Sequence, residues 1–399
     1  MWSGAFVSNV GTWMQTVAIG IYVTEVTDQA TWTGTVAAAG FVPIALLAPL
    51  GGALADRVNR RTLLATTSLV QALIATVMTV LFIEGDPTAP ILTLLVFLDG
   101  VAAAIGFPAY QAVLPELVPE EELPGAVSLS STQYNLGRVV GPALAGIVIA
   151  IGGGVPDGLS WALALNAVSF LAVVVVVLSL DLAPPIQHAE GESLRESMLQ
   201  GARFVRRDPG LRVSFSAMCV NTLLAAPFIA LVPAMAQQVL DEGERGTSIL
   251  VTAQGIGAVA MGLMLGTLTQ RYGPRRVVIT MLSSLPVALA CYALAPGIAS
   301  SAIALVFVGA FYLGCLSSFF TIAQLRAPAH MRGRVVAVNN IVLGSLYPLG
   351  AVIQGKAADW WGLRATTLVS AILLAAVWLT VRAVRPGISR VIEPATAAS

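Results

Sequence analysis

Apolar runs of membrane-spanning length divide nearly the whole sequence. A helix needs about 20 predominantly apolar residues to cross the hydrocarbon core of a bilayer, and this chain of 399 residues is 57% hydrophobic and only 11% charged. Backbone groups in lipid must be hydrogen-bonded within their own segment, so such runs are helical. We therefore predict an all-α integral membrane protein. Its twelve transmembrane helices are expected at residues 4–26, 33–55, 62–83, 90–113, 125–151, 158–180, 211–239, 247–270, 276–296, 299–325, 334–358 and 363–384.

Basic residues collect in every second link between these runs. Of the 21 Lys and Arg residues, seventeen lie in one set of alternate links or in the C-terminal tail. Loops rich in Lys and Arg stay on the cytoplasmic side of the membrane. The asymmetry predicts that both termini are cytoplasmic. The first run leaves almost no tail after Met1, as it would in a truncated chain.

A short polar link is repeated in the two halves of the chain. Residues 52–61 read Gly-Ala-Leu-Ala-Asp-Arg-Val-Asn-Arg-Arg, and residues 266–276 read Gly-Thr-Leu-Thr-Gln-Arg-Tyr-Gly-Pro-Arg-Arg. Repeated six-helix halves are typical of transporters whose substrate site lies between the halves. We expect two pseudo-symmetric six-helix bundles at residues 1–180 and 211–385, a linker at 181–210 and a tail at 386–399. Residues 193–206 of the linker have the pattern of an amphipathic helix.

The sequence contains no constellation for catalysis or for binding a metal or phosphate. The histidines, His188 and His330, lie in separate links, and the three cysteines lie in apolar runs without paired spacing. The glycine triplet at residues 152–154 is not followed by Gly-Lys-Ser/Thr. We therefore expect no catalytic residues, no cofactor, no metal and no nucleic-acid partner.

The link between the second and third apolar runs, residues 52–61, carries a known pattern. The motif Gly-x-x-x-Asp-Arg-x-x-Arg-Arg at this place resembles the signature loop of the major facilitator superfamily. The segments at residues 7–15, 115–119 and 135–142 resemble its transmembrane secretion effector branch, which includes enterobactin-exporter-like and macrolide-efflux-like proteins. The resemblance implies a monomeric, multi-pass secondary transporter of a bacterial plasma membrane.

We interpret the two copies of the link as conformational latches that stabilise one access state. Glycine permits close helix approach, the aspartate can accept hydrogen bonds, and the arginines hold the membrane surface. The alternative is that the arginines only orient insertion, which leaves the aspartate unexplained. Gln270 replaces the aspartate in the second copy, so that latch should be weaker. The latch residues are Gly52, Asp56, Arg57, Arg60, Arg61, Gly266, Arg271 and Arg275.

The fifth run contains a second family-like motif. Gly137, Gly141, Pro142 and Gly146 resemble the antiporter motif of exporters in this superfamily. The alternative is helix packing alone, since small residues allow tight contact and proline bends a helix. Ala145 stands where the family has a glycine, which weakens the antiport inference.

Asp99 and Arg138 are the two charges expected near the middle of the membrane. Ionisable groups at this depth are costly and usually face a cavity or each other. We predict that both face a central cavity and that they couple transport to proton exchange. The alternative is a permanent ion pair that locks two helices together.

Several polar and aromatic residues are candidates for substrate contact. The resemblance implies that the first, fourth, seventh and tenth helices line the cavity. Ordinary helix packing is the alternative for each candidate. The candidates are Trp13, Gln15, Asn221, Phe228, Tyr312 and Gln324.

The function expected from the resemblance is proton-coupled efflux by alternating access. The cargo would be a hydrophobic or amphipathic small molecule, such as a drug, a macrolide or a siderophore-like compound, and the partners would be protons and the lipid bilayer. One alternative is a proton-coupled importer of a small nutrient. Another is a membrane scaffold or sensor that transports nothing.

Overall fold

The protein is a bundle of long helices. The computed structural model describes residues 1–180, 194–328 and 331–384, and no strand occurs among them. The long helices are α1 (Trp2–Thr27), α2 (Ala30–Arg57), α3 (Arg60–Glu84), α4 (Ala89–Val113), α5 (Leu123–Ile151), α6 (Asp157–Ser179), α8 (Pro209–Leu224), α10 (Gly243–Tyr272), α11 (Pro274–Leu294), α12 (Ile298–Arg326), α13 (Arg332–Trp361) and α14 (Leu363–Val384). Shorter elements are α7 (Leu194–Arg207), α9 (Phe228–Ala234), the 3-10 turns η1 (Leu114–Glu116) and η2 (Glu120–Glu122), and the π-helical turn η3 (Met235–Val239).

Eleven spans of the described chain are long and apolar enough to cross a membrane. The twelfth predicted span, α1, is 26 residues long and is not among these eleven. Asn9, Thr12 and Gln15 lie on it, and α1 packs against α2, α5, α6, α9 and α10. A helix surrounded by other helices is shielded from lipid, so it needs fewer apolar residues than a helix at the rim.

The seventh span was predicted as one continuous helix over residues 211–239, but the structure breaks it. The helix stops after Leu224 and resumes at Phe228 as α9, which passes into η3. Pro227 lacks the N–H that would bond to the carbonyl of Leu223 four residues earlier. The side-chain amide of Gln354 on α13 donates instead to the carbonyls of Leu223 and Leu224, at 3.1 and 3.0 Å. The break is thus compensated from a neighbouring helix, as backbone in lipid requires.

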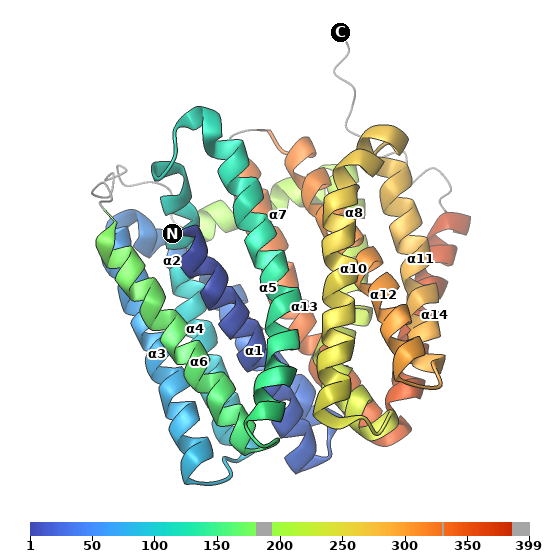
Figure 1. Cartoon of the computed structure of the whole chain (residues 1–399). Helices are drawn as coiled ribbons and strands as arrows, with labels where there is room; N and C mark the ends of the chain where they lie inside the picture. The colour runs from blue at the N-terminus through green and yellow to red at the C-terminus, as the bar shows by residue number, and fades with distance from the viewer. Residues whose placement is uncertain (181–193, 329–330, 385–399) are drawn as a thin grey trace.

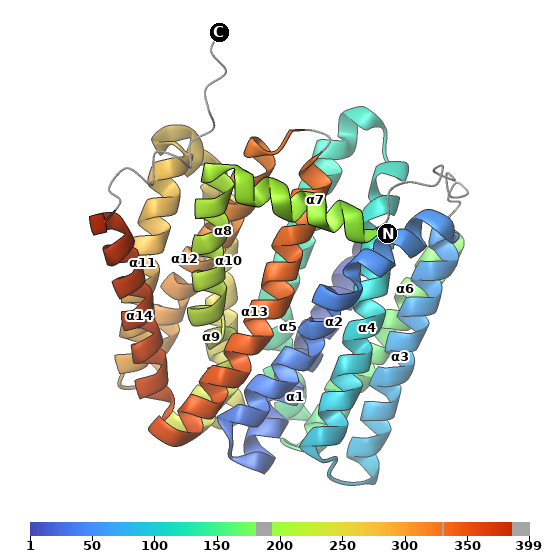
Figure 2. The ribbon, with the colours of Figure 1, turned by 180° about the vertical axis from the view of Figure 1, so that it is seen from behind.

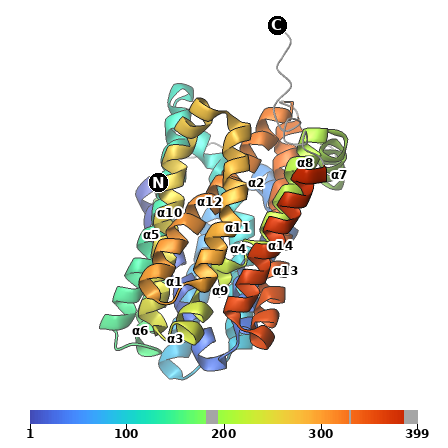
Figure 3. The ribbon, with the colours of Figure 1, turned by 90° about the vertical axis from the view of Figure 1, so that its right-hand side faces the viewer.

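The two halves of the chain lie side by side and each has its own apolar core. Helices α1 to α6 form one side of Figure 1 and α8 to α14 form the other. Met14, Tyr22 and Leu163 belong to the core of the first half, whereas Met218 and Leu285 belong to that of the second. Figure 3 views the second half from outside, where α11 and α14 pack together on its flank.

Two helix pairs make the most extensive contacts between the halves. Helix α5 packs against α10 on one face (Figure 1), and α2 packs against α13 on the opposite face (Figure 2). The repeat relates α2 to α10 and α5 to α13, so the two interfaces are pseudo-equivalent. Glycines permit the contact on both faces: a Cβ on Gly344 of α13 would lie 2.8 Å from the backbone nitrogen of Ala45, and one on Gly255 of α10 would lie 2.9 Å from the carbonyl oxygen of Arg138.

The linker contains the expected amphipathic helix. Helix α7 runs across the ends of the long helices at the top of Figure 2 and packs against α8 and α13. A Cβ on Gly201 would lie 2.7 Å from the carbonyl oxygen of Arg334, so α7 sits directly on the start of α13. We call this end of the molecule, which carries α7, Arg60, Arg61, Arg326 and Arg334, the basic end. The rest of the linker up to residue 193 and the tail at 386–399 lie outside the described residues.

Candidate functional site

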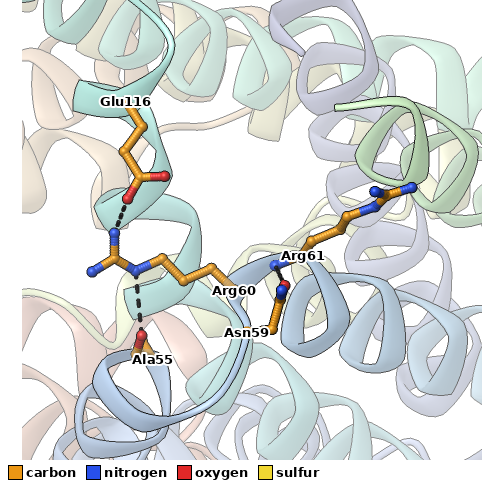
Figure 4. A network of polar contacts seen from close by, with 5 residues as sticks. All are labelled: Ala55, Asn59, Arg60, Arg61 and Glu116. Carbon is orange, nitrogen blue, oxygen red and sulfur yellow. Dashed lines mark hydrogen bonds and ion pairs between the residues drawn. The ribbon is translucent and has the colours of Figure 1, made fainter. Parts of the chain in front are cut away.

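The first latch motif organises the basic end of the N-terminal half (Figure 4). Asn59 caps α3, because its side-chain oxygen accepts from the backbone N–H groups of Arg61 and Thr62 at 2.9 and 3.3 Å. Arg60 donates from Nε to the carbonyl of Ala55 at 3.3 Å and forms an ion pair with Glu116 of η1. These contacts tie the loop to α2, α3 and the end of α4.

Arg61 extends the network to a fourth helix. Its guanidinium donates to the carbonyl of Leu178 in the last turn of α6. The C-terminal carbonyls of a helix carry partial negative charge, so a cation is favourable there. These contacts of Arg60 and Arg61 lie within the N-terminal half, so the loop braces that half at the basic end.

The glycine of each latch motif is not at a close helix contact in this conformation. A Cβ on Gly52 or on Gly266 would meet nothing within 4 Å, contrary to the expectation that Gly52 brings two helices together. The close contact belongs to Gly51, where a Cβ would lie 2.6 Å from the carbonyl oxygen of Ala104. Successive helix residues point about 100° apart, so Gly52 faces away from α4.

The remaining latch residues differ in their surroundings. Arg57 is exposed, and the side chain of Asp56 lies outside the described part of the structure. In the second copy, Arg271 lies over the ring of Tyr272, with 5.5 Å from its guanidinium carbon to the ring centroid. Arg275 has an interaction of its own.

The glycines of the α5 motif lie at close helix contacts. A Cβ on Gly137 would lie 3.1 Å from Cβ of Asn9, and one on Gly141 would lie 2.7 Å from the carbonyl oxygen of Val10, both on α1. On Gly146 it would lie 2.6 Å from Oγ of Ser248 on α10, across the two halves. Pro142 lies inside α5. The motif therefore packs α5 against α1 and against the other half at once.

Asp99 and Arg138 do not form the ion pair that the sequence analysis considered. Asp99 of α4 accepts a 3.3 Å hydrogen bond from the side-chain amide of Gln71 on α3. Arg138 of α5 lies over the ring of Trp13 on α1, with 5.2 Å from its guanidinium carbon to the ring centroid. The structure thus places Asp99 between two helices of the N-terminal half and Arg138 elsewhere, beside α1.

Arg138 faces the junction of the two halves. Its charge acts on the phenols of Tyr312 on α12 and Tyr347 on α13. Its Nε is buried without a hydrogen-bond partner. Tyr312 also contacts Phe228 edge to face, with ring centroids 5.7 Å apart.

Three of the six substrate candidates lie around this junction: Tyr312 contacts Phe228, and Trp13 contacts Arg138. Gln15 is turned away, because it accepts a 2.8 Å hydrogen bond from Asn166 of α6 inside the N-terminal half. Gln324 is exposed near the basic end of α12. Asn221 is fully buried, and neither its side-chain nitrogen nor its oxygen has a hydrogen-bond partner.

The contacts that join the halves at the end opposite the basic end were not predicted from the sequence. Asp359 of α13 accepts hydrogen bonds from the backbone N–H groups of Ala30 and Thr31, at 2.7 and 3.2 Å, in the first turn of α2. Gln238 donates to Asp28 at 3.2 Å, and Gln237 donates to the carbonyl of Ile21 at 3.0 Å. An acidic residue at the end of an otherwise apolar span was the available signal.

A second missed contact fixes the linker. Arg326 of α12 makes two hydrogen bonds to Asp208, at 2.8 and 2.9 Å, and Asp208 also accepts from the backbone N–H of Leu211 at 2.7 Å as the N-cap of α8. Burial by itself would raise the pKa of Asp208. The hydrogen bonds from Arg326 and Leu211 and the charge of Arg326 outweigh burial and hold this pKa below its ordinary value.

Comparison with known proteins decides the family. Residues 1–391 match the family described as transmembrane secretion effector. The chain belongs to this family. It is therefore a transporter of the major facilitator type and not an enzyme, and it is a multi-pass membrane protein.

This transmembrane secretion effector has relatives along nearly its whole length. It is 25% identical to macrolide efflux protein A of Streptococcus pyogenes over 94% of this chain and 92% of that protein. It is 29% identical to the multidrug efflux pump Tap of Mycolicibacterium fortuitum, covering 91% and 90%. It is 26% identical to the enterobactin exporter EntS of Escherichia coli, covering 95% and 91%.

Solved structures share the fold of the secretion effector at low sequence identity. A bacterial homologue of the human lysosomal transporter Spinster superposes with a TM-score of 0.75 at 12% identity, covering 98% of this chain and 96% of that one. A D-xylose-proton symporter gives a TM-score of 0.70 at 14% identity, covering 94% and 96%. These neighbours confirm the major facilitator fold.

Proposed function

We propose that this secretion effector exports a hydrophobic or amphipathic small molecule by alternating access, driven by proton entry. The observation that carries the proposal is that three relatives, each matched over about nine-tenths of its length, are named as efflux or export proteins. The two separate cores, joined through α2–α13 and α5–α10, support a rocking motion of one half against the other.

We infer that Asp99 is the residue that exchanges protons. Its partner is a glutamine, whose amide has both a donor and an acceptor and so can serve either the ionised or the protonated carboxyl group. An arginine partner would bind only the ionised form. Arg138, which the sequence analysis grouped with Asp99, supports coupling from the junction of the halves. The glycines of the α5 motif would hold the helices that must move together.

We infer further that this conformation is open toward the basic end. Contacts between the halves gather at the opposite end, where Asp359 holds α2 and Gln238 holds Asp28. Gly52 and Gly266 at the basic end have no close neighbour, so both latches have room to tighten when the basic end closes. By the distribution of arginine, the basic end and both termini lie in the cytoplasm of a bacterial cell.

The chain supplies both halves of the pathway, so we propose that it works as a monomer in the bilayer. We propose the domain division expected from the sequence: residues 1–180 would move as one bundle and residues 211–385 as the other, with residues 181–210 as the linker.

The direction of transport and its coupling to protons are tested in everted membrane vesicles, in which respiration acidifies the lumen. We expect accumulation of at least one of a labelled macrolide, a catecholate siderophore and the dye rhodamine 123, and collapse of that accumulation by an uncoupler. A proton-coupled importer would instead drive cargo out of such vesicles, and a scaffold or sensor would change nothing.

The variant Asp99→Asn isolates the coupling step. It should lose proton-driven accumulation and keep downhill exchange of cargo. Asp86→Asn is the matched control, because Asp86 is an exposed carboxylate in the loop after α3. Accumulation by Asp99→Asn that equals the wild type, with the same pH dependence, would remove Asp99 from the proposal.

A further inference from the structure

Arg138 is a cation without a counterion at the junction of the two halves. Within the described part of the chain, no hydrogen bond or ion pair reaches it, and its Nε is sealed from solvent. Its contact is with the face of Trp13. A guanidinium carries five N–H donors and no acceptor, and a charge at membrane depth is costly and commonly functional. The molecule therefore holds unused donors where its two halves meet.

Two phenols lie within electrostatic range of Arg138. The phenols of Tyr312 and Tyr347 both feel the charge of Arg138, and neither hydroxyl makes a hydrogen bond within the described structure. Asp99, the mid-membrane carboxylate, is engaged with Gln71.

Aromatic rings from both halves pack on Trp13, Tyr312 and Tyr347. Trp13 packs edge to face on Tyr134, with ring centroids 6.3 Å apart. Tyr312 packs on Phe228, and Tyr347 packs on Phe41 of α2 with ring centroids 4.8 Å apart. These rings belong to α1, α5, α9, α12, α13 and α2, and they offer flat apolar surfaces beside the unused donors.

We propose that Arg138, Tyr312 and Tyr347 form an anion-binding subsite for cargo that carries a carboxylate or phenolate group on an aromatic body. The anion accepts from the guanidinium and from the two hydroxyls, and its ring lies against Trp13 or Tyr312. A cationic cargo meets the uncompensated charge of Arg138 in a low-dielectric setting and is repelled. This inference rests on the proposed export function for its biological meaning, but the binding step is separate from transport.

Two dyes with the same ring system and opposite charge test the subsite. Fluorescein is anionic at mildly alkaline pH, and rhodamine 123 is cationic. Binding of each dye to the purified full chain in detergent is followed by fluorescence anisotropy. We expect the wild type to bind fluorescein at least about tenfold more tightly than rhodamine 123, since a charge-assisted hydrogen bond contributes this much or more.

The variants Arg138→Gln and Arg138→Lys identify the residue responsible. Arg138→Gln should weaken fluorescein binding about tenfold or more and leave rhodamine 123 binding equal or stronger. Arg138→Lys should lose less, because it keeps the charge but not the planar fork. Arg245→Gln is the matched control: it removes one exposed arginine at the opposite end of the molecule and should leave both affinities unchanged.

Each outcome decides the proposal. Wild-type protein that binds the two dyes equally, or that does not bind fluorescein, overturns it even if Arg138→Gln fails to fold. Folded Arg138→Gln with wild-type fluorescein affinity shows that Arg138 only packs on Trp13, and it also overturns the proposal. Export of rhodamine 123 without fluorescein binding would leave the transport function standing and the subsite refuted. Fluorescein binding that depends on Arg138, without export of any dye, would support the subsite and refute the proposed transport function.

Discussion

The carboxylate of Asp359 accepts a 2.7 Å hydrogen bond from the backbone N–H of Ala30 and so ties the last turns of α13 to the first turn of α2. The bond joins the two halves of the chain at the end opposite the basic end. Backbone N–H groups in the first turn of a helix have no partner within the helix, and negative charge there is favourable. Opening this end must break the contact.

Asp359→Ala should therefore shift the conformational equilibrium toward molecules that are open at the opposite end. A charged cap contributes about 1–2 kcal/mol, so the ratio of open to closed molecules should rise roughly 5- to 30-fold. The measurement is the distance distribution between spin labels at Asp28→Cys and Gln238→Cys, which should gain longer distances. Asp359→Asn keeps an acceptor oxygen and should shift the distribution less. Identical distributions in all three backgrounds would show that the contact does not hold this end closed.

Gln354→Leu should destabilise the fold. It removes the donor to the carbonyls of Leu223 and Leu224 at the break in the seventh span, and each unsatisfied buried carbonyl costs about 1–3 kcal/mol. The midpoint of thermal unfolding in detergent reports the loss. Gln29→Leu is the matched control, because Gln29 is exposed and its side chain caps nothing. Equal midpoints for the two variants would mean that the break needs no compensation from α13.

The ion pair of Asp208 with Arg326 should make stability fall in acid. The pKa of Asp208 is held below its ordinary value in the folded state. The pair therefore contributes stability above the ordinary carboxyl pKa of about 3.9, and that contribution is lost as the pH falls through the lowered value. Asp208→Asn should be less stable than the wild type at neutral pH, and the difference between their unfolding midpoints should shrink in acid. A difference that stays constant with pH would contradict this account.

The ion pair between Arg60 and Glu116 should survive exchange of its partners. The side chains are 14% and 24% exposed, so we expect a coupling energy of about 1 kcal/mol, at the upper end for accessible pairs. Arg60→Glu and Glu116→Arg should each lower the unfolding midpoint, and the double variant should recover part of the loss. Recovery should be incomplete, because Arg60 also donates to Ala55. A double variant as unstable as the sum of the single changes would mean that the pair contributes nothing.

The positions of the helices could be predicted from the sequence because lipid forces backbone polar groups into helical hydrogen bonds, which makes apolar length a direct signal. The break after Leu224 could not, because its compensation comes from Gln354, which lies far along the chain on α13. The shielding of α1 from lipid could likewise not be predicted, because it depends on the helices that pack around it.

The site residues divide in the same manner. The α5 glycines at helix contacts follow from the rule that small residues permit close packing, whereas the cap formed by Asn59 was not among the predictions. Which way Asp99 and Arg138 point depends on helix rotation, and hydropathy does not report rotation: Asp99 turned toward Gln71 and Arg138 toward Trp13. Asp359 was missed because a helix N-terminus attracts acidic residues from any part of the fold.

The central claim is that the two halves must part at the end opposite the basic end in every transport cycle. The test uses a chain in which serine replaces the native cysteines Cys219, Cys291 and Cys315. The substitutions Asp28→Cys and Gln238→Cys then place two thiols across that end, where Nε2 of Gln238 lies 3.2 Å from Oδ1 of Asp28. The measurement is proton-driven dye uptake into everted vesicles before cross-linking, after cross-linking and after reduction. The account predicts that cross-linking abolishes uptake and that reduction restores it. Undiminished uptake by the cross-linked protein would contradict it.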